Sequence, residues 1–358
     1  MTRHLRILSR YTRLGASSRL RTMQYRPWLE QDGWTVEHLS FFDDAYLERV
    51  YRQDRKGSGI ARYYRKRLAD LRRTPKPDLI WLEYEAFPWL PWFLESALLP
   101  KNVGIVSDYD DAIFHRYDQH PRAVIRALLG PKIDYVMAYS RLVTAGNTYL
   151  AQRAQAAGAA RVEIVPTVVD LNLYHLRKGS AASSLRVGWI GTPHTWETLA
   201  SSIYETLLPE LAAQGAMFRA VGAALKERTE KRLELVPWSE GDEVHLIQGM
   251  DIGVMPMPDT PWTRGKCGYK LIQYMACGLP VVAAPVGVNT KIVEHGVNGF
   301  LAETDAEWQS SIGKLLQDSK LRQRMGAAGR KKVEAEYSLQ VWAPRVSDML
   351  SHTVAAPH

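Results

Sequence analysis

The stretch from Asp251 to Pro285 most constrains what this chain can fold into. An apolar run at 252–255 predicts a buried strand, and prolines after it open a loop. A helix is expected from about Tyr269 to Gly278, a residue suited to a left-handed helix end. A second apolar strand follows. Strand, glycine-containing loop, short helix and strand in this order indicate a unit of a parallel α/β sheet.

The loop in this stretch has the chemistry of an anion site. It precedes a helix N-terminus, whose unpaired N–H groups and dipole attract negative charge. Arg264, Lys266 and Lys270 add positive charge. Gln273 shares a helix face with Lys270, so Lys270 can meet a phosphate while Gln273 reaches a hydroxyl or amide. The alternative is an ordinary surface loop with solvated cations.

Two runs in this region, Gln273-Tyr-Met-Ala-Cys-Gly-Leu-Pro-Val-Val-Ala and Glu294-His-Gly-Val-Asn-Gly-Phe-Leu, resemble the nucleotide-sugar site of group 1 (GT4-like) glycosyltransferases of the GT-B fold. That family has two acidic residues here, with seven residues between them. This chain has Gly265 and Gln273 at those positions, and Lys270 matches a subset of the family. The resemblance implies that Gln273 approaches the ribose hydroxyls, by hydrogen bonds without charge.

Length and composition agree with a globular protein of two domains. The chain has 358 residues, 46% of them hydrophobic and 23% charged, which is long for one core. No apolar run approaches the ~18–20 residues that span a bilayer, and the basic N-terminus does not resemble a signal peptide. Cys267 and Cys277 lack metal-ligand spacing. A cytoplasmic location, or the cytoplasmic face of a membrane, is therefore expected.

Positive charge is concentrated at the start of the chain. Residues 1–75 hold 17 Lys or Arg against 8 Asp or Glu. No zinc finger, RNA-recognition signature or basic zipper accompanies this charge, so no nucleic-acid partner is expected. The densest cluster, Arg62–Arg73, predicts an amphipathic basic helix. Its cations are either a solvated helix face or a contact with an anionic membrane.

A strand, a loop and a helix are expected at the N-terminus, with the helix opening at Ala16 and Ser17 or Ser18 as its cap. The resemblance places this loop near the donor diphosphate. The donor-binding candidates here are Gly15, Ser18, Arg19 and Arg21. The alternative is a tight turn with surface arginines.

A buried strand beginning at Val103 ends in three carboxylates, with a histidine one turn later. Polar residues at the carboxyl ends of parallel strands point into the ligand crevice. We therefore take Asp110, Asp111 and His115 as catalytic candidates, since the resemblance puts a polar residue near the reacting sugar there. The D-x-D spacing of Asp108 and Asp110 favours a metal site instead, and helix capping is a third interpretation.

Two further segments have expected structures. Residues 138–140 and 142–147 resemble two successive strands of the family. Trp89 and Trp92 lie among prolines, and we expect burial in the core, with an acceptor site or a bilayer surface as alternatives.

The second domain is expected to open with a strand that ends at Gly191, followed by a helix capped by Thr195. The resemblance makes Gly191, Thr192 and His194 donor-binding candidates. It also makes Trp238 a residue that stacks on the base. No Arg or Lys lies between Gly191 and Leu199. The phosphate charge must therefore come from Arg264, Lys266 or Lys270, with the N–H groups of Gly268 and Tyr269 beside them, or from the arginines of the first domain.

The resemblance implies an α/β protein of the GT-B fold, with two Rossmann-like domains facing a cleft. We expect an acceptor-binding domain at 1–178, a linker at 178–184, and a donor-binding domain at 179–337. A C-terminal helix at 338–358 is expected to pack back on the first domain.

The implied activity is transfer of a sugar from a UDP- or GDP-sugar to a hydroxyl of a glycan, polysaccharide or lipid-linked acceptor. The implied reaction retains the anomeric configuration and needs no metal or other cofactor. The expected partners are the nucleotide sugar, the acceptor and an anionic membrane surface. The alternatives are a non-catalytic GT-B subunit and a nucleotide-sugar epimerase.

Overall fold

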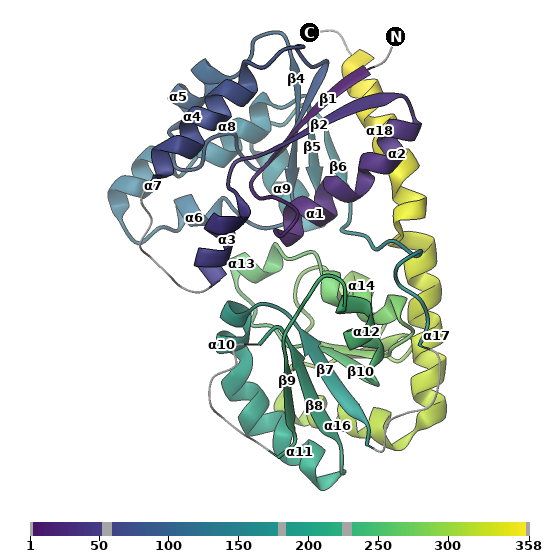
Figure 1. Ribbon diagram of the computed structural model, residues 1–358. Coiled ribbons are helices and arrows are strands. Elements are labelled where there is room, and N and C mark those ends of the chain that lie inside the picture. The colour runs from purple at the N-terminus through teal and green to yellow at the C-terminus, as the bar shows by residue number, and fades with distance from the viewer. Residues whose placement is uncertain (1–2, 52–58, 178–183, 224–230, 356–358) are drawn as a thin grey trace. The chain divides into compact units, whose positions relative to one another are not determined.

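The computed structural model describes residues 3–51, 59–177, 184–223 and 231–355, drawn as ribbons in Figure 1. Its contacts define two units. Unit 1 comprises residues 1–167, 264–267 and 342–358, and unit 2 comprises residues 168–263 and 268–341. The first segment of unit 1 ends at Thr167, whereas the expected domain boundary is at 178. The expected linker lies, except for Ser184, outside the described residues.

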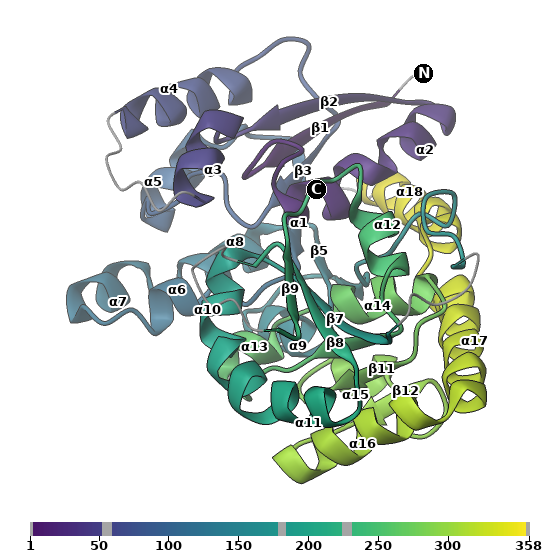
Figure 2. The same cartoon turned by 60° about the horizontal axis from the view of Figure 1, so that its bottom comes forward.

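Unit 1 is built on a six-stranded parallel sheet in the order β2-β1-β3-β4-β5-β6. Its strands are β1 (Arg3–Ser9), β2 (Trp34–Ser40), β3 (Leu79–Glu83), β4 (Gly104–Tyr109), β5 (Leu142–Ala145) and β6 (Val162–Ile164). β3 and β4 are buried along their whole length, because helices cover both faces of the sheet (Figures 1 and 2). The register pairs Glu83 with Asp108, so the carboxyl ends of β3 and β4 lie side by side.

The helices of unit 1 begin with α1 (Ala16–Arg21), a 3-10 turn (Met23–Tyr25), α2 (Arg26–Gln31), α3 (Asp44–Tyr51) and α4 (Ile60–Leu71). They continue with α5 (Trp92–Leu98), α6 (His115–Asp118), α7 (Ala123–Leu129), α8 (Lys132–Tyr139) and α9 (Thr148–Ala156). α18 (Leu339–Ala355) belongs to unit 1 from Trp342 onwards.

Three expectations for unit 1 are wrong. Residues 138 and 139 end helix α8 and are not part of a strand. The first helix is preceded by Gly15 and has no side-chain cap, because the Ser18 hydroxyl donates to Glu83 instead (2.6 Å). Trp89 is exposed, and its backbone has a left-handed φ of 64°.

Unit 2 has a second six-stranded parallel sheet, in the order β12-β11-β10-β7-β8-β9. Its strands are β7 (Arg186–Ile190), β8 (Met217–Val221), β9 (Leu233–Val236), β10 (Ile252–Met255), β11 (Val281–Ala283) and β12 (Gly299–Leu301). The predicted strand at 252–255 is confirmed as β10. The predicted helix is confirmed as α14 (Tyr269–Ala276), followed by Gly278 at a left-handed φ of 78°.

The helices of unit 2 begin with α10 (Pro193–Ser202), a π-helical turn (Ile203–Leu207), α11 (Leu208–Ala213) and α12 (Glu243–Gln248). α13 (Pro261–Arg264) interrupts the predicted loop, and its last residue, Arg264, belongs to unit 1 by its contacts. Next come α14, α15 (Asn289–Ile292), α16 (Asp305–Gln317) and α17 (Ser319–Glu336). α10 begins at Pro193, so Thr195 lies inside the helix and does not cap it. Instead, the Thr195 backbone N–H donates to Thr192 Oγ1 (3.4 Å), at the limit of a hydrogen bond.

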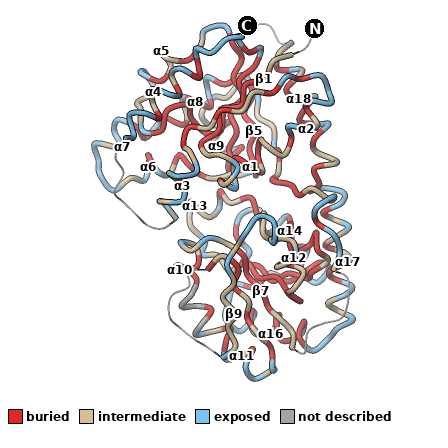
Figure 3. The backbone as a smooth tube through the Cα atoms, viewed as in Figure 1, coloured by how far each residue is buried: buried red, intermediate tan, exposed pale blue. Residues whose placement is uncertain are grey.

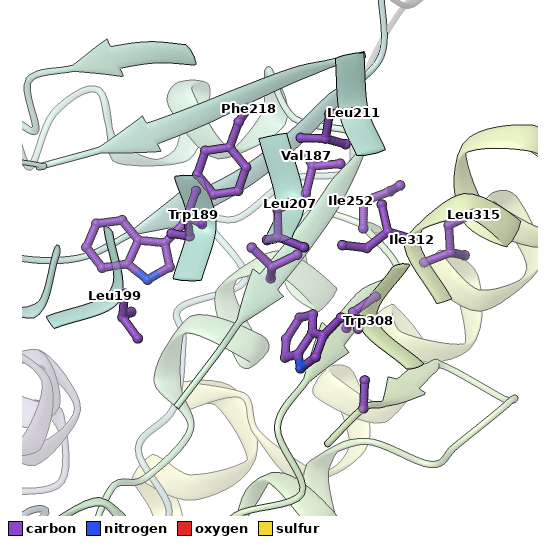
Figure 4. Close-up of a cluster of buried hydrophobic side chains, with 14 of the residues drawn as sticks. Val187, Trp189, Leu199, Leu207, Leu211, Phe218, Ile252, Trp308, Ile312 and Leu315 are labelled. Carbon is purple, nitrogen blue, oxygen red and sulfur yellow. The ribbon is translucent and has the colours of Figure 1, made fainter. Parts of the chain in front are cut away.

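The core of unit 2 packs β7, β8 and β10 against α10, α11 and α16, as Figure 4 shows for its large side chains. Trp189 and Phe218 come from neighbouring strands, and Trp308 and Ile312 come from α16. The strands in the middle of each sheet are buried, whereas the outer faces of the helices are exposed (Figure 3).

Two simple properties of the described chain bear on its environment. Within residues 3–51, 59–177, 184–223 and 231–355, no helix is both long and apolar enough to cross a membrane. Cys267 and Cys277 are buried free thiols.

Candidate functional site

Two glycines at the carboxyl ends of β7 and β8 in unit 2 leave no room for a side chain. A Cβ at Gly191 would lie 2.3 Å from the Trp189 ring. A Cβ at Gly222, which has a φ of 75°, would lie 2.2 Å from the carbonyl oxygen of Gly191. Side chains are therefore excluded from both positions, which leaves backbone at the edge of the sheet. Thr192 and His194 follow and are exposed.

Lys270 lies beside this glycine edge. Its Nζ sits 5.4 Å from the centre of the Trp189 ring, a contact that attracts a cation to the ring face. Lys270 belongs to the first turn of α14, which starts after Gly268 at a φ of 65° with no side-chain cap. A lysine, an uncapped helix start and a bare glycine turn thus meet within one unit, which suits a bound anion.

Glu243, the first residue of α12, was not anticipated from the sequence. Its carboxylate accepts hydrogen bonds from the Tyr174 hydroxyl (2.5 Å), Gln273 Nε2 (2.8 Å) and Trp238 Nε1 (2.7 Å). Gln273 is buried, and it also donates to the Tyr174 hydroxyl (2.7 Å), whose oxygen lies 3.3 Å from that of Tyr269. A carboxylate is therefore present next to position 273, although residue 273 itself is uncharged.

Residues 264–267 make their contacts within unit 1. Asn147 Nδ2 donates to the carbonyl oxygens of Gly265 and Lys266, both at 2.9 Å. Lys266 Nζ forms an ion pair with Asp111 (2.8 Å). A Cβ at Gly265 would lie 2.7 Å from the backbone nitrogen of Ala112. An acidic side chain therefore has no room at position 265.

The carboxyl ends of β3 and β4 gather buried charge. Asp108 accepts from Arg21 (2.7 and 2.9 Å) and from Thr144 (2.5 Å). Glu83 Oε2 accepts from the Ser18 hydroxyl (2.6 Å) and the Arg10 backbone N–H (2.9 Å). Burial raises the pKa of Glu83 to about 7. The Glu83 carboxyl at the end of β3 therefore holds the predicted loop after β1 through two hydrogen bonds.

The catalytic candidates lie just beyond this buried layer. Asp110 accepts from the Tyr84 hydroxyl, and burial, together with the negative charge of Asp110, raises the pKa of Tyr84 well above its usual range. His115 Nδ1 lies 2.8 Å from Asp118 Oδ1, and His115 Nε2 lies 2.9 Å from the Tyr149 hydroxyl. Both ring nitrogens of His115 therefore have partners within unit 1.

The remaining N-terminal candidates have local contacts. The Gly15 N–H donates to the Thr12 carbonyl (3.0 Å), and the Arg19 guanidinium donates to the Arg13 carbonyl (3.0 Å). A Cβ at Gly15 would lie 2.5 Å from Cβ of Tyr11. These contacts stabilise the loop around Gly15 and Arg19. The donor-binding role of these two residues stays a prediction.

The D-x-D interpretation does not fit the contacts of Asp108, because the buried Arg21 guanidinium pairs with its carboxylate and would repel a metal cation. In the part of the chain that the structure describes, no group of three or more His, Cys, Asp or Glu side chains is placed to hold a metal ion. The predicted independence from metal stays a prediction.

Comparison with known proteins bears on fold and family. Residues 184–318 match the model of "Glycosyl transferases group 1". The chain is 26% identical over 248 residues to a D-inositol 3-phosphate glycosyltransferase of Kineococcus radiotolerans, covering 56% of each protein. It is 31% identical over 116 residues to a GDP-mannose-dependent monoacylated alpha-(1-6)-phosphatidylinositol monomannoside mannosyltransferase of Corynebacterium glutamicum, covering 30% of this chain and 29% of that protein. The chain thus matches only about half, or less, of the length of these relatives.

Solved structures resemble the whole chain. Sucrose-phosphate synthase from Thermosynechococcus elongatus has a TM-score of 0.74 at 14% identity, covering 99% of this chain and 100% of that one. Anabaena HepE, solved in complex with UDP and glucose, has a TM-score of 0.69 at 17% identity, covering 98% and 100%. The chain therefore has the two-domain α/β architecture of the GT-B fold. Its second unit carries the sequence pattern of the group 1 glycosyltransferases.

Proposed function

We propose that unit 2 binds a nucleoside-diphosphate sugar and that the protein transfers the sugar to a hydroxyl. The observation that carries the proposal is Lys270 packed on Trp189 beside Gly191, at the uncapped start of α14. A diphosphate placed there would meet a cation, backbone N–H groups and no obstructing side chain. The UDP bound to Anabaena HepE, a protein of the same fold, supports this choice of ligand.

We propose that Glu243 supplies the carboxylate that binds the ribose hydroxyls. The resemblance gives that task to an acidic residue at position 273, where this chain has glutamine. Glu243 Oε1 lies 2.8 Å from Gln273 Nε2. The carboxylate is therefore on the residue that accepts a hydrogen bond from position 273, and not on residue 273 itself. The indole of Trp238, held by Glu243 Oε2, would then lie beside the base.

The proposed reaction breaks the bond between the anomeric carbon and the diphosphate and forms a bond to the acceptor oxygen. Lys270 and the N–H groups of α14 stabilise the charge that develops on the leaving diphosphate. We infer retention of configuration and independence from metal, as the resemblance implies. The leaving phosphate takes the acceptor proton, and Asp110 and Asp111 orient the acceptor hydroxyl.

The acceptor is proposed to be a sugar or cyclitol hydroxyl, on a glycan or a lipid-linked intermediate. The names of the relatives support this class, because they include an inositol phosphate and a phosphatidylinositol mannoside. The acceptor would bind near Asp110 and Asp111, the half-buried carboxylates that follow β4.

A nucleotide screen tests the donor proposal. We expect UDP or GDP and the matching sugar nucleotide to raise the melting temperature equally with and without EDTA. A ligand at a hundred times its dissociation constant adds about 2.7 kcal/mol to stability. Lys270→Ala should abolish the shift, whereas Lys291→Ala, at an exposed lysine of the same unit, should preserve it. No shift with any nucleotide would refute the proposal and favour a non-catalytic subunit, and isomerised donor without acceptor would reveal an epimerase.

A further inference from the structure

Unit 2 has a cavity of about 280 Å³ between α10, the π-helical turn after it and the start of α16. We call it the α10–α16 cavity. The loop after β10 and Ala284 after β11 complete its lining, whereas Gly191, Lys270 and Gln273 of the proposed donor site do not line it. The cavity lies where β10, β11 and β12 end, and open α/β sheets bind their ligands at this edge.

The floor of the α10–α16 cavity is apolar. Leu199, Ile203, Leu207 and Trp308 line it and are buried, and the partly buried Met257 packs on the same cluster. Figure 4 shows Leu199, Leu207 and Trp308 among the side chains of this cluster. A floor of this kind attracts a ring or a short alkyl stem, because such a group gains by leaving water.

One wall of the cavity is the π-helical turn Ile203–Leu207, which follows directly on α10. Ile203, Thr206 and Leu207 of this turn all line the cavity. π-helical turns are rare in proteins, and they are found frequently at functional sites. The presence of such a turn in the wall favours a binding cavity over a chance gap between helices.

Two carboxylates stand at the rim of the cavity. Glu303 and Asp305 line it and are exposed. In the part of the chain that the structure describes, neither of these carboxylates has a hydrogen bond or an ion pair. Glu307 differs, because its Oε2 accepts from the backbone N–H groups of Glu303 (2.7 Å) and Thr304 (3.1 Å) and so closes the capping box of α16. The helix start therefore uses Glu307 and leaves the other two carboxylates available to a ligand.

The segments around the cavity are acidic throughout. Residues 196–208, 255–260, 283–286 and 302–309 together contain six Asp or Glu and no Lys or Arg, although the whole chain has a net charge of +8. A concentration of one charge attracts ligands of the opposite sign, and a carboxylate forms strong, charge-assisted hydrogen bonds with an ammonium group. The charge of this cavity thus favours a cation and disfavours phosphates and nucleotides.

We propose that the α10–α16 cavity binds a small organic ammonium ion, that is, a protonated amine on a short apolar body. The apolar body lies against Leu199, Leu207 and Trp308, and the ammonium group meets Glu303 and Asp305. A protein partner is a poorer occupant, because a cavity of about 280 Å³ is far smaller than the roughly 800 Å² that each partner buries in a stable interface. The proposal is independent of the transfer reaction, since it concerns a separate cavity and not the donor site.

NMR titration of the full chain with 2-phenylethylamine tests this proposal, with 2-phenylethanol as the neutral analogue and 3-phenylpropanoate as the anionic one. We expect a dissociation constant on the order of 1 mM for the amine, about tenfold weaker binding of the alcohol and no binding of the acid. Glu303→Gln with Asp305→Asn should weaken binding of the amine about tenfold and leave binding of the alcohol unchanged. Thr198→Phe, at an exposed residue of α10 that lines the cavity, should block both ligands. Glu334→Gln with Glu336→Gln removes two exposed carboxylates of α17, is the matched control and should bind as the wild type does.

Four results would overturn the proposal. The first is no binding of the amine, and the second is equal binding of the amine and the alcohol. The third is equal binding of the amine by the wild type and the Glu303/Asp305 double variant, and the fourth is binding of the amine that Thr198→Phe leaves unchanged. Circular dichroism and the melting temperature of each variant show that it is folded. A protein that binds the amine but ignores nucleotides would uphold the cavity and refute the donor site, so the two proposals fail separately.

Discussion

Replacing Gln273 by glutamate introduces the acidic residue that group 1 glycosyltransferases have at this position. We expect this substitution to destabilise unit 2. Gln273 Nε2 donates to Glu243 Oε1 at 2.8 Å, so the substitution sets two carboxylates against each other. At an effective dielectric constant of 20, two like charges at this distance repel by about 6 kcal/mol. Taking up one proton at pH 7 relieves the repulsion at a cost of about 4 kcal/mol, for a carboxyl with an ordinary pKa near 4.3.

The expected loss of unfolding free energy at pH 7 is therefore about 4 kcal/mol, falling to below about 1 kcal/mol near pH 4.5. Urea unfolding followed by tryptophan fluorescence measures it for the wild type, Gln273→Glu, Glu243→Gln and the double variant. In the double variant, the new glutamine at position 243 donates to the new glutamate at position 273. It should therefore recover most of the lost unfolding free energy. Equal stability of Gln273→Glu and the wild type at pH 7, or no recovery in the double variant, would refute the charge relocation.

Three further predictions concern unit 1. The pKa of Glu83 in the folded state, about 7, lies above its unfolded value. Its contribution to stability is therefore complete below about pH 4.5 and is lost as the pH rises through 7. This loss amounts to about 3 kcal/mol of unfolding free energy, and Glu83→Gln should remove it, as urea titrations at several pH values can measure. Gly265→Ala should lower stability by about 1–3 kcal/mol, because the new methyl group meets the Ala112 backbone, and an unchanged melting temperature would contradict this. Arg21→Ala should cost about 3–5 kcal/mol, because it leaves Asp108 buried without its partner, and pairing it with Asp108→Asn should recover part of the loss in denaturant titrations.

The unit around α14 could be predicted from local sequence. The apolar run at 252–255, the glycine after the helix and the apolar run after Pro280 each act over a few residues, and the structure has the strand, helix and strand they predict. Lys270 could also be placed, because its position in the first turn of α14 follows from the position of the helix start.

Glu243 could not be found in this way. It meets Tyr174 and Gln273, which are 69 and 30 residues away along the chain. No periodicity or capping rule links residues at such separations. The exposure of Trp89 was missed for a related reason. A cluster of aromatic residues predicts burial on average, whereas the exposure of Trp89 depends on distant partners, since its ring packs on Tyr117 and His120 and is otherwise left uncovered.

The sequence by itself determined the two-domain α/β class and the glycine-rich, basic segment before α14, because hydrophobic period and turn chemistry are local properties. Only the tertiary structure decided which partner each charged side chain meets. Lys266 pairs with Asp111, Arg21 pairs with Asp108, and Gln273 donates a hydrogen bond to Glu243. A charge is used by whichever partner the folded chain brings within hydrogen-bond distance, and that partner is set by the packing of the sheets.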